Sequence, residues 1–151
     1  MKLEPFLQQQ GVPFEKHAHS VVYTSQQLAQ AEHVPGYVVA KPVIVKRATG
    51  FAMCVLAAPQ HLDLRRAAEA LHEPEVRLAT EAEMAPLFPD SELGAEPPVG
   101  TLFGLPTIMD QTLKDNEYLV MQSGAHTQAI RMRREDWERV CQPQVAALAT
   151  S

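Results

Sequence analysis

The sequence predicts an α+β fold, in which strands and helices share one core. Two observations support this prediction. The chain contains β-branched or apolar runs of strand length as well as amphipathic segments with a helical period. These segments do not alternate regularly as β-α-β units, which disfavours a doubly wound parallel sheet. A chain of 151 residues has the size of one domain, which we expect to span residues 1–151.

Turn and capping residues separate the elements expected in the first half of the chain. These elements are a helix at 3–11, a strand at 12–20, a helix at 25–34 and strands at 37–48 and 51–58. Gly11 is expected to end the first helix, and Thr24 is expected to cap the second. The turn at Thr49-Gly50 lies between two apolar runs, so the sequence predicts a β-hairpin there.

Capping signals also define the second half. The expected elements are helices at 63–72, 81–88 and 134–142 and strands at 75–79, 101–110, 117–124 and 127–133. Asp63 is expected to cap its helix, with Leu64 among the residues that face inward. Thr80 and Glu83 have the spacing of a capping box. Trp137 is expected to anchor the last helix in the core.

The composition excludes several classes of protein. With a net charge of −5, the chain lacks the basic excess of a protein that coats nucleic acid, although a few cations would suffice to bind the end of an RNA. Two distant cysteines, Cys54 and Cys141, favour reduced thiols over a disulfide framework. The sequence has neither the apolar run of a signal peptide nor about 18 consecutive apolar residues. We therefore expect a cytoplasmic protein that binds neither membrane nor DNA.

Lys41 lies within the apolar run at 37–48, where an unpaired lysine is unusual. Because side chains alternate along a strand, Lys41, Val43 and Val45 share one face and Lys46 points to the other. Two interpretations remain open for Lys41. One is a lysine on an edge strand that extends to solvent, which Pro42 favours because proline lacks an amide donor. The other is a functional lysine.

The loop GAEPPVG at 94–100 combines two prolines with a glycine at each end. Proline stiffens the backbone, while glycine permits close approach and positive φ angles. The loop suits a turn between strands or a wall of backbone against a ligand. Downstream, His126 follows Gly124 at a strand end, which by itself indicates only a turn.

Metal binding is not expected. The candidate ligand pairs are His17 with His19 and His61 with Asp63, and neither pair has a third ligand at supporting spacing. The sequence also lacks a glycine-rich phosphate loop and a G-x-S-x-G elbow. We therefore expect no metal and no other cofactor.

In sequence order, Lys41, the G-x-x-x-P motif from Gly94 to Pro98 and the glycine-small-histidine motif from Gly124 to His126 resemble the YbaK/EbsC-type aminoacyl-tRNA deacylases. These are relatives of the editing insertion domain of bacterial prolyl-tRNA synthetase. The resemblance extends over nearly the whole chain. It implies a mixed, strongly twisted, barrel-like sheet with flanking helices.

The same resemblance implies a function. The protein would be a trans-editing hydrolase that cleaves the ester of mischarged aminoacyl-tRNA, carrying a small non-cognate amino acid on tRNA-Pro or a similar tRNA. A separate editing step is needed because a synthetase distinguishes two amino acids that differ by one methylene by only about 1–3 kcal/mol of binding free energy. The partners would be the acceptor end of the tRNA and an aminoacyl-tRNA synthetase. Alternatives are a non-catalytic module of the same fold that binds aminoacyl-tRNA or a small ligand, and a hydrolase of another small ester.

The motifs assign candidate residues. By resemblance, the catalytic set is Lys41, Gly94, Pro98 and His126, and Gly100 and Gly124 line the substrate pocket. Lys41 would neutralise groups at the 3′ end of the tRNA. His126 would orient the loop or the terminal ribose, and the alternative is that it acts as a general base. Backbone amides of residues 94–100 are expected to stabilise the oxyanion. Many relatives have phenylalanine after the motif proline, whereas this chain has Val99, which leaves the amino-acid preference open.

Four further cations are candidates for phosphate contact on the basis of charge. They are Lys46, Arg47, Arg131 and Arg133. The alternative for each is a solvated surface charge, because exposed ion pairs and cations are common and contribute little.

Overall fold

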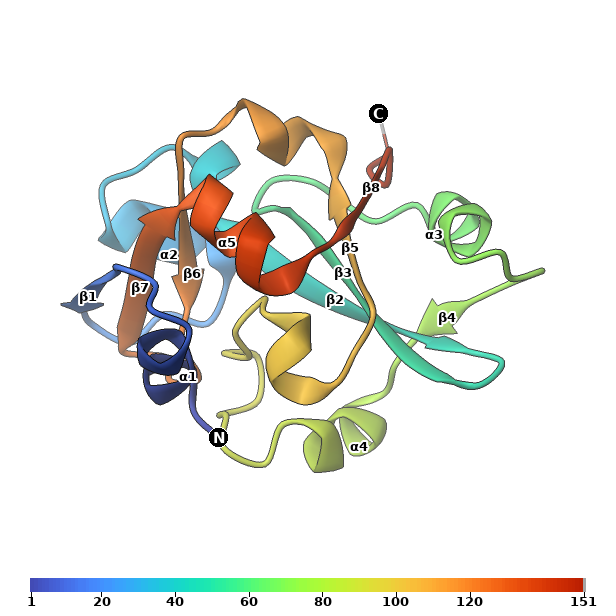
Figure 1. The fold of residues 1–151 in the computed structure, drawn as a ribbon, viewed down its shortest axis with the longest axis horizontal. Helices are drawn as coiled ribbons and strands as arrows, with labels where there is room; N and C mark the ends of the chain where they lie inside the picture. Colours follow the sequence, from blue (N-terminus) through green and yellow to red (C-terminus); the bar gives the residue numbers. More distant parts are fainter. Residues whose placement is uncertain (151) are drawn as a thin grey trace.

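The computed structural model describes residues 1–150 (Figure 1). Its helices are α1 (Leu3–Gln9), α2 (Ser25–Ala31), α3 (Leu64–Ala70), α4 (Glu81–Met84) and α5 (Arg134–Cys141). Its strands are β1 (Glu15–Ala18), β2 (Ala40–Arg47), β3 (Gly50–Ala57), β4 (Arg77–Leu78), β5 (Thr107–Asp110), β6 (Tyr118–Gln122), β7 (Gln128–Arg133) and β8 (Gln144–Ala146). Short 3-10 helices are η1 (Gly36–Val38), η2 (Ala85–Leu87), η3 (Gly100–Phe103) and η4 (Gln111–Asp115).

The strands form two sheets. The smaller has the order β1-β7-β6, and the larger has the order β4-β2-β3-β5-β8. All pairs are antiparallel except β3 with β5 and β5 with β8. A parallel bridge between Val39 and Val120 joins the two sheets, so β2 begins beside β6 (Figure 1). The α+β class is thus confirmed, while the strands of residues 1–150 form no closed barrel.

The predicted hairpin is β2 with β3. Arg47 pairs with Gly50 next to the turn, and Lys41 pairs with Leu56 at the other end. Val45 packs in the cluster beneath α3, whereas Ile44 belongs to the main core on the opposite face. The predicted alternation of side chains along β2 is therefore correct.

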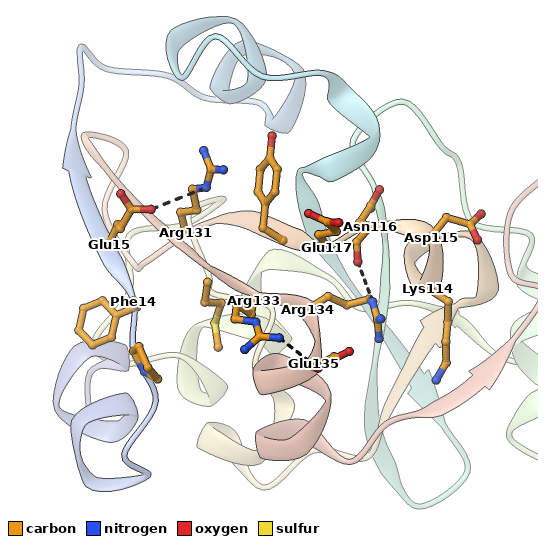
Figure 2. A pocket seen from close by; sticks show the side chains of 13 residues that line it. Phe14, Glu15, Lys114, Asp115, Asn116, Glu117, Arg131, Arg133, Arg134 and Glu135 are labelled. Atoms are coloured by element: carbon orange, nitrogen blue, oxygen red, sulfur yellow. Dashed lines mark hydrogen bonds and ion pairs between the residues drawn. The ribbon is translucent and has the colours of Figure 1, made fainter.

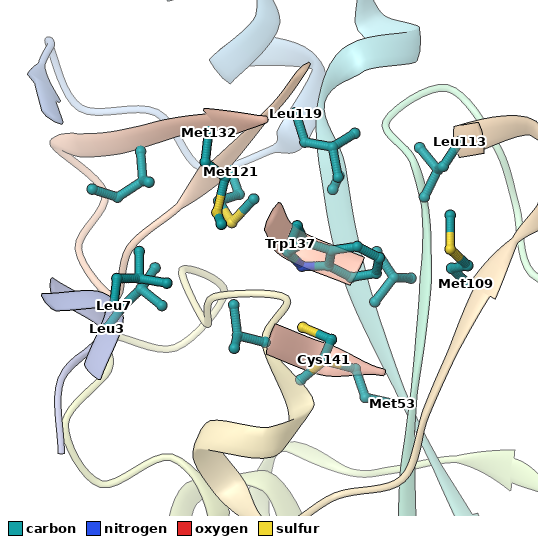
Figure 3. Close-up of a cluster of buried hydrophobic side chains, with 14 of the residues drawn as sticks. Leu3, Leu7, Met53, Met109, Leu113, Leu119, Met121, Met132, Trp137 and Cys141 are labelled. Carbon is teal, nitrogen blue, oxygen red and sulfur yellow. The ribbon is translucent and has the colours of Figure 1, made fainter. Parts of the chain in front are cut away.

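The main core lies between the two sheets and is closed by α1 and α5. Trp137 from α5 is fully buried at its centre, among Leu119, Met121 and Met53 (Figure 3). A second apolar cluster lies under α2, and a third lies under α3. Burial of this aromatic side chain anchors α5 over the core, as the sequence predicted.

The capping residues predicted from the sequence do cap their helices. The Asp63 carboxylate accepts hydrogen bonds from the amides of Arg65 and Arg66 at the start of α3. Thr80 and Glu83 form a reciprocal capping box. In the part of the chain that the structure describes, no helix is long and apolar enough to cross a membrane.

Two expectations were wrong in detail, and one strand was missed. Only Thr107–Asp110 is a strand in the segment predicted at 101–110, because the chain first forms η3 and then turns at Gly104, whose φ is +67°. Leu64 is exposed, since it lies in the first turn of α3 where the chain has not yet reached the core. The short strand β8 was not predicted at all.

Candidate active site

The loop at 94–100 forms a wall between surface and core. Gly94 is exposed and adopts a φ of +86°, whereas the six residues that follow it are buried. The indole nitrogen of Trp137 donates a hydrogen bond to the carbonyl oxygen of Pro98, at 2.8 Å. The core helix α5 therefore holds the proline end of the loop, and only the glycine end faces solvent.

Backbone hydrogen bonds join this loop to the segment that follows β6. The amide of Gly124 donates to the carbonyl of Ala95, at 2.8 Å, and the amide of Glu92 donates to the carbonyl of Gly124, at 2.7 Å. The side-chain amide of Gln122 also donates to the carbonyl of Gly94, at 3.4 Å. Two of the motifs found in the sequence, about 30 residues apart, therefore form one site.

His126 lies against the exposed end of the loop. Its Nδ1 lies 2.9 Å from the carbonyl oxygen of Val22, and its Nε2 lies 2.8 Å from that of Leu93. Its ring packs at 5.1 Å, centroid to centroid, from Tyr23. Carbonyl oxygens only accept, so both contacts are hydrogen bonds only when both ring nitrogens carry a proton. Each ring nitrogen therefore lies against a carbonyl oxygen of the surrounding loops, an arrangement that fits the orienting role expected for His126.

Sequence reasoning missed Glu96, the acidic residue inside the motif. Its side chain is buried, with 5% of the residue exposed, and both carboxylate oxygens accept from the amide of Gly94, at 3.0 and 3.1 Å. Gln122, which bonds the carbonyl of the same glycine, is equally buried. The only sequence signal was a carboxylate placed between glycine and proline, a position that is usually solvent-exposed.

The oxyanion donors expected from this loop are mostly occupied. The amides of Gly94, Ala95 and Val99 donate to acceptors within residues 92–97, and that of Gly100 donates to the sulfur of Cys141. The two prolines have no amide donor. Among the described residues, the amide of Glu96 is the one N–H of residues 94–100 that has no partner. The expectation that the whole loop supplies donors was therefore too broad.

Gly100 has a packing role that explains its presence. It is buried, and a Cβ added there would lie 1.8 Å from Oγ1 of Thr107 and 2.8 Å from the carbonyl oxygen of Leu105. Such distances leave no room for a side chain. Its predicted contact with substrate has no support from this geometry, since the residue faces β5 inside the fold.

Lys41 is half-buried at the start of β2. Its ammonium group donates to the carbonyl oxygens of Ala58, at 2.9 Å, and of Gln60. Burial lowers the pKa of this lysine from its usual value. Both acceptors lie in the turn after β3. Within residues 1–150, no hydrogen bond joins Lys41 to Gly94 or His126, although the bridge between the sheets brings β2 alongside β6.

Lys46 and Arg47 lie at the far end of β2, beside the hairpin turn. The ammonium of Lys46 lies 5.0 Å from the centre of the Phe51 ring. The guanidinium of Arg47 contacts the carboxylate of Glu73, at 3.2 Å. Five or six residues of strand separate these cations from Lys41, which is roughly 17–20 Å at the usual rise per residue. Their contacts lie along the hairpin and with Glu73, away from Lys41.

Arg131 and Arg133 line a separate hollow of about 740 Å³, bounded by β1, β7 and the start of α5 (Figure 2). The guanidinium of Arg131 stacks 3.7 Å from the ring centre of Tyr118 and contacts Glu15 at 3.7 Å. Arg133 contacts Glu135 at 3.3 Å. Because each cation already faces a carboxylate, this hollow is not a concentrated positive surface for phosphate.

The two cysteines are buried free thiols. Burial raises the pKa of Cys54 and of Cys141 to about 12 in each case. At neutral pH both are therefore protonated and unreactive, as befits small core residues. No group of three or more histidine, cysteine or acidic side chains within residues 1–150 has the arrangement of a metal site.

Comparison with known families decides what this fold is. The family model of the aminoacyl-tRNA editing domain matches residues 19–140. The chain belongs to the aminoacyl-tRNA editing domain family. The matched region includes both motifs that meet at Gly94, together with Lys41. No curated protein matches the chain in sequence.

Solved structures show the same editing-domain fold. A protein described as "a putative trans-editing enzyme for prolyl tRNA synthetase" superposes with a TM-score of 0.85 at 22% identity, covering 98% of this chain and 94% of its own. A hypothetical protein superposes with a TM-score of 0.89 at 19% identity, covering 99% and 100%. At these identities the likeness establishes the fold alone.

Proposed function

We propose that the protein is a free-standing trans-editing deacylase that hydrolyses the ester of mischarged aminoacyl-tRNA. The substrate is a small non-cognate amino acid on tRNA-Pro or a similar tRNA. One observation supports this most directly. In a member of the editing family, the loop at 94–100 is hydrogen-bonded to the segment from Gly124 to His126, and the exposed Gly94 lies at their junction.

Hydrolysis of an aminoacyl ester requires few groups from the protein. An aminoacyl ester is an activated acyl group, so a held water molecule and stabilisation of the developing oxyanion suffice. In our proposal the ester lies against Gly94, and the free amide of Glu96 stabilises the oxyanion. His126 keeps the loop in place through its contact with the carbonyl of Leu93. Lys41 acts on the phosphate or ribose of the terminal nucleotide, which requires its ammonium to exchange a carbonyl partner for substrate.

The proposal sets the cellular context. The enzyme acts in the cytoplasm on the acceptor end of the tRNA, alone or beside an aminoacyl-tRNA synthetase. Because its net charge is −5, the enzyme contacts the tRNA only near the acceptor end. A second sieve of this kind removes errors that the binding pocket of a synthetase cannot reject.

The direct test is a deacylation screen. Transfer RNAs charged with alanine, serine, cysteine and other small amino acids are incubated with enzyme, and release of the amino acid is followed against spontaneous hydrolysis. We expect release of at least one small non-cognate amino acid well above background. Background rates across the whole set would contradict the proposal.

A binding module of the same fold is the second candidate. It is favoured by the internal use of most loop amides, which leaves few donors for an oxyanion. The distinguishing experiment uses aminoacyl-tRNA linked through a stable amide in place of the ester. Tight binding of this analogue, combined with no release from the ester, would favour the binding module.

A further inference from the structure

Glu96 and Gln122 form a polar cluster around the peptide of Gly94, and the editing chemistry does not require their side chains. We propose that this cluster binds the α-ammonium group of the aminoacyl ester, with the carboxylate of Glu96 as the charged partner. The inference rests on the proposed function, and it adds which part of the substrate is recognised and by which residue.

The cluster has more acceptors than donors. Both oxygens of Glu96 share a single donor, the amide of Gly94. Oε1 of Gln122 is buried and has no hydrogen-bond partner among residues 1–150. An ionised carboxylate alone can accept about four hydrogen bonds. Several acceptor positions are therefore unused beside one glycine.

The carboxylate of this cluster also has no cationic partner. In the described part of the chain, no lysine, arginine or histidine forms an ion pair with Glu96. Buried carboxylates are usually paired with a cation, because removing the charge from water is costly. Only 5% of Glu96 is exposed and its carboxylate lacks that partner, which marks a site prepared for a cation from outside.

A primary ammonium fits this arrangement. It carries one positive charge and three N–H donors and has no acceptor. Glu96 lies at the amide side of Gly94, and Gln122 lies at its carbonyl side. Because Gly94 itself is exposed, a ligand that contacts its backbone from solvent lies next to both side chains. In an aminoacyl ester the ammonium is two bonds from the carbonyl carbon, so it accompanies the ester into this site.

The consequence is selectivity for a free α-amine. An ester whose amine is replaced by a hydroxyl has nearly the same shape but no charge, so it leaves the carboxylate unpaired. Hydrogen bonds to charged groups are strong enough to give about a 10- to 100-fold difference in rate. Glu96 is then a specificity-determining residue, and its side chain does not take part in bond cleavage.

The experiment compares two esters of one tRNA, alanyl-tRNA and lactyl-tRNA, in single-turnover hydrolysis. Another amino acid and its hydroxy analogue replace this pair if the screen identifies a better substrate. Each rate is divided by the spontaneous rate of the same ester, because the ammonium activates the carbonyl even without enzyme. We expect the parent to favour the amine ester about 10- to 100-fold. Glu96→Gln, which keeps an acceptor for the amide of Gly94, should abolish this preference.

The outcomes are separable. Hydrolysis of neither ester by the parent overturns the proposed function itself. Equal enhancement of both esters by the parent overturns the ammonium site but leaves the function standing. A merely structural role for Glu96 predicts that Glu96→Gln slows both esters equally. Glu69→Gln, on exposed α3, removes the same charge elsewhere and should keep the parent preference.

A second variant allows the inference to be tested even if Glu96→Gln does not fold. Gln122→Met removes the unpaired Oε1 with little change of volume and should reduce the preference for the amine ester in part. Thermal unfolding of each variant shows whether the fold survives. If Glu96→Gln does not fold, a preference for the amine ester in folded Gln122→Met that is as large as that of the parent rejects the inference.

Discussion

Replacing Gly94 by alanine tests whether the loop is a substrate wall or only a turn. The added Cβ would meet Cε1 of His126 at 3.5 Å, an ordinary van der Waals contact. The cost in stability therefore comes from the backbone, whose φ of +86° is unfavourable for any residue with a Cβ. This amounts to about 1–2 kcal/mol. In a chain of this size it lowers Tm by about 2–8 °C.

The rate should suffer far more than the stability. A methyl group on the exposed backbone displaces the ester from its donor, and a displacement of about 1 Å can cost about 10²-fold. Gly104→Ala is the matched control, because Gly104 has a φ of +67°, is exposed and has nothing within 4 Å of an added Cβ. The assays are single-turnover deacylation and thermal unfolding of both variants. Parent-like turnover by Gly94→Ala, or an equal loss in Gly104→Ala, would refute the assignment.

Three other predictions follow from contacts in the structure. Lys41→Ala should slow deacylation about 10²-fold. It should also lower the free energy of unfolding by about 1–3 kcal/mol, because two carbonyl groups lose their donor. Lys46→Ala, on the opposite face of the strand, should change neither quantity. The hydrogen bond from Arg77 lowers the pKa of Glu83 to about 2, so its contribution to stability is present above the unfolded value of 4.5 and is lost as pH falls towards 2. Unfolding curves of the parent and Glu83→Gln should therefore converge over that range, and a constant gap would contradict the assignment. The buried thiols should react with a thiol reagent only after unfolding, and rapid labelling of the native protein would show that they are accessible.

Local signals in the sequence were sufficient for much of the fold. The hairpin of β2 and β3 follows from two apolar runs around Thr49-Gly50, and the caps at Asp63 and Thr80 depend on residues three positions apart at most. Both kinds of structure are decided by neighbours in the chain. The α+β class followed from the same patterns.

Features decided by distant contacts could not be predicted. Strand β8 lies on β5, and the chain after it is held by the buried carboxylate of Asp110, which accepts from the amides of Leu148 and Ala149. Burial of Glu96 likewise depends on the tertiary packing of its loop, whose Gly94 is hydrogen-bonded by Gln122, 28 positions further along the chain. A sequence pattern shows a charged residue in a loop and gives no sign that tertiary packing will enclose it. The occupied amides of that loop were hidden for the same reason.

The hydrogen bond from Trp137 to Pro98 has a practical consequence. Trp137 is the only tryptophan in the chain, so the intrinsic fluorescence excited at the red edge of the protein spectrum originates from the residue that holds the loop. Indole emission responds to changes in its polar contacts. A ligand that shifts the loop should therefore change the emission of the unmodified protein, and titration with a non-hydrolysable aminoacyl-tRNA analogue would report occupancy of the site without any attached dye.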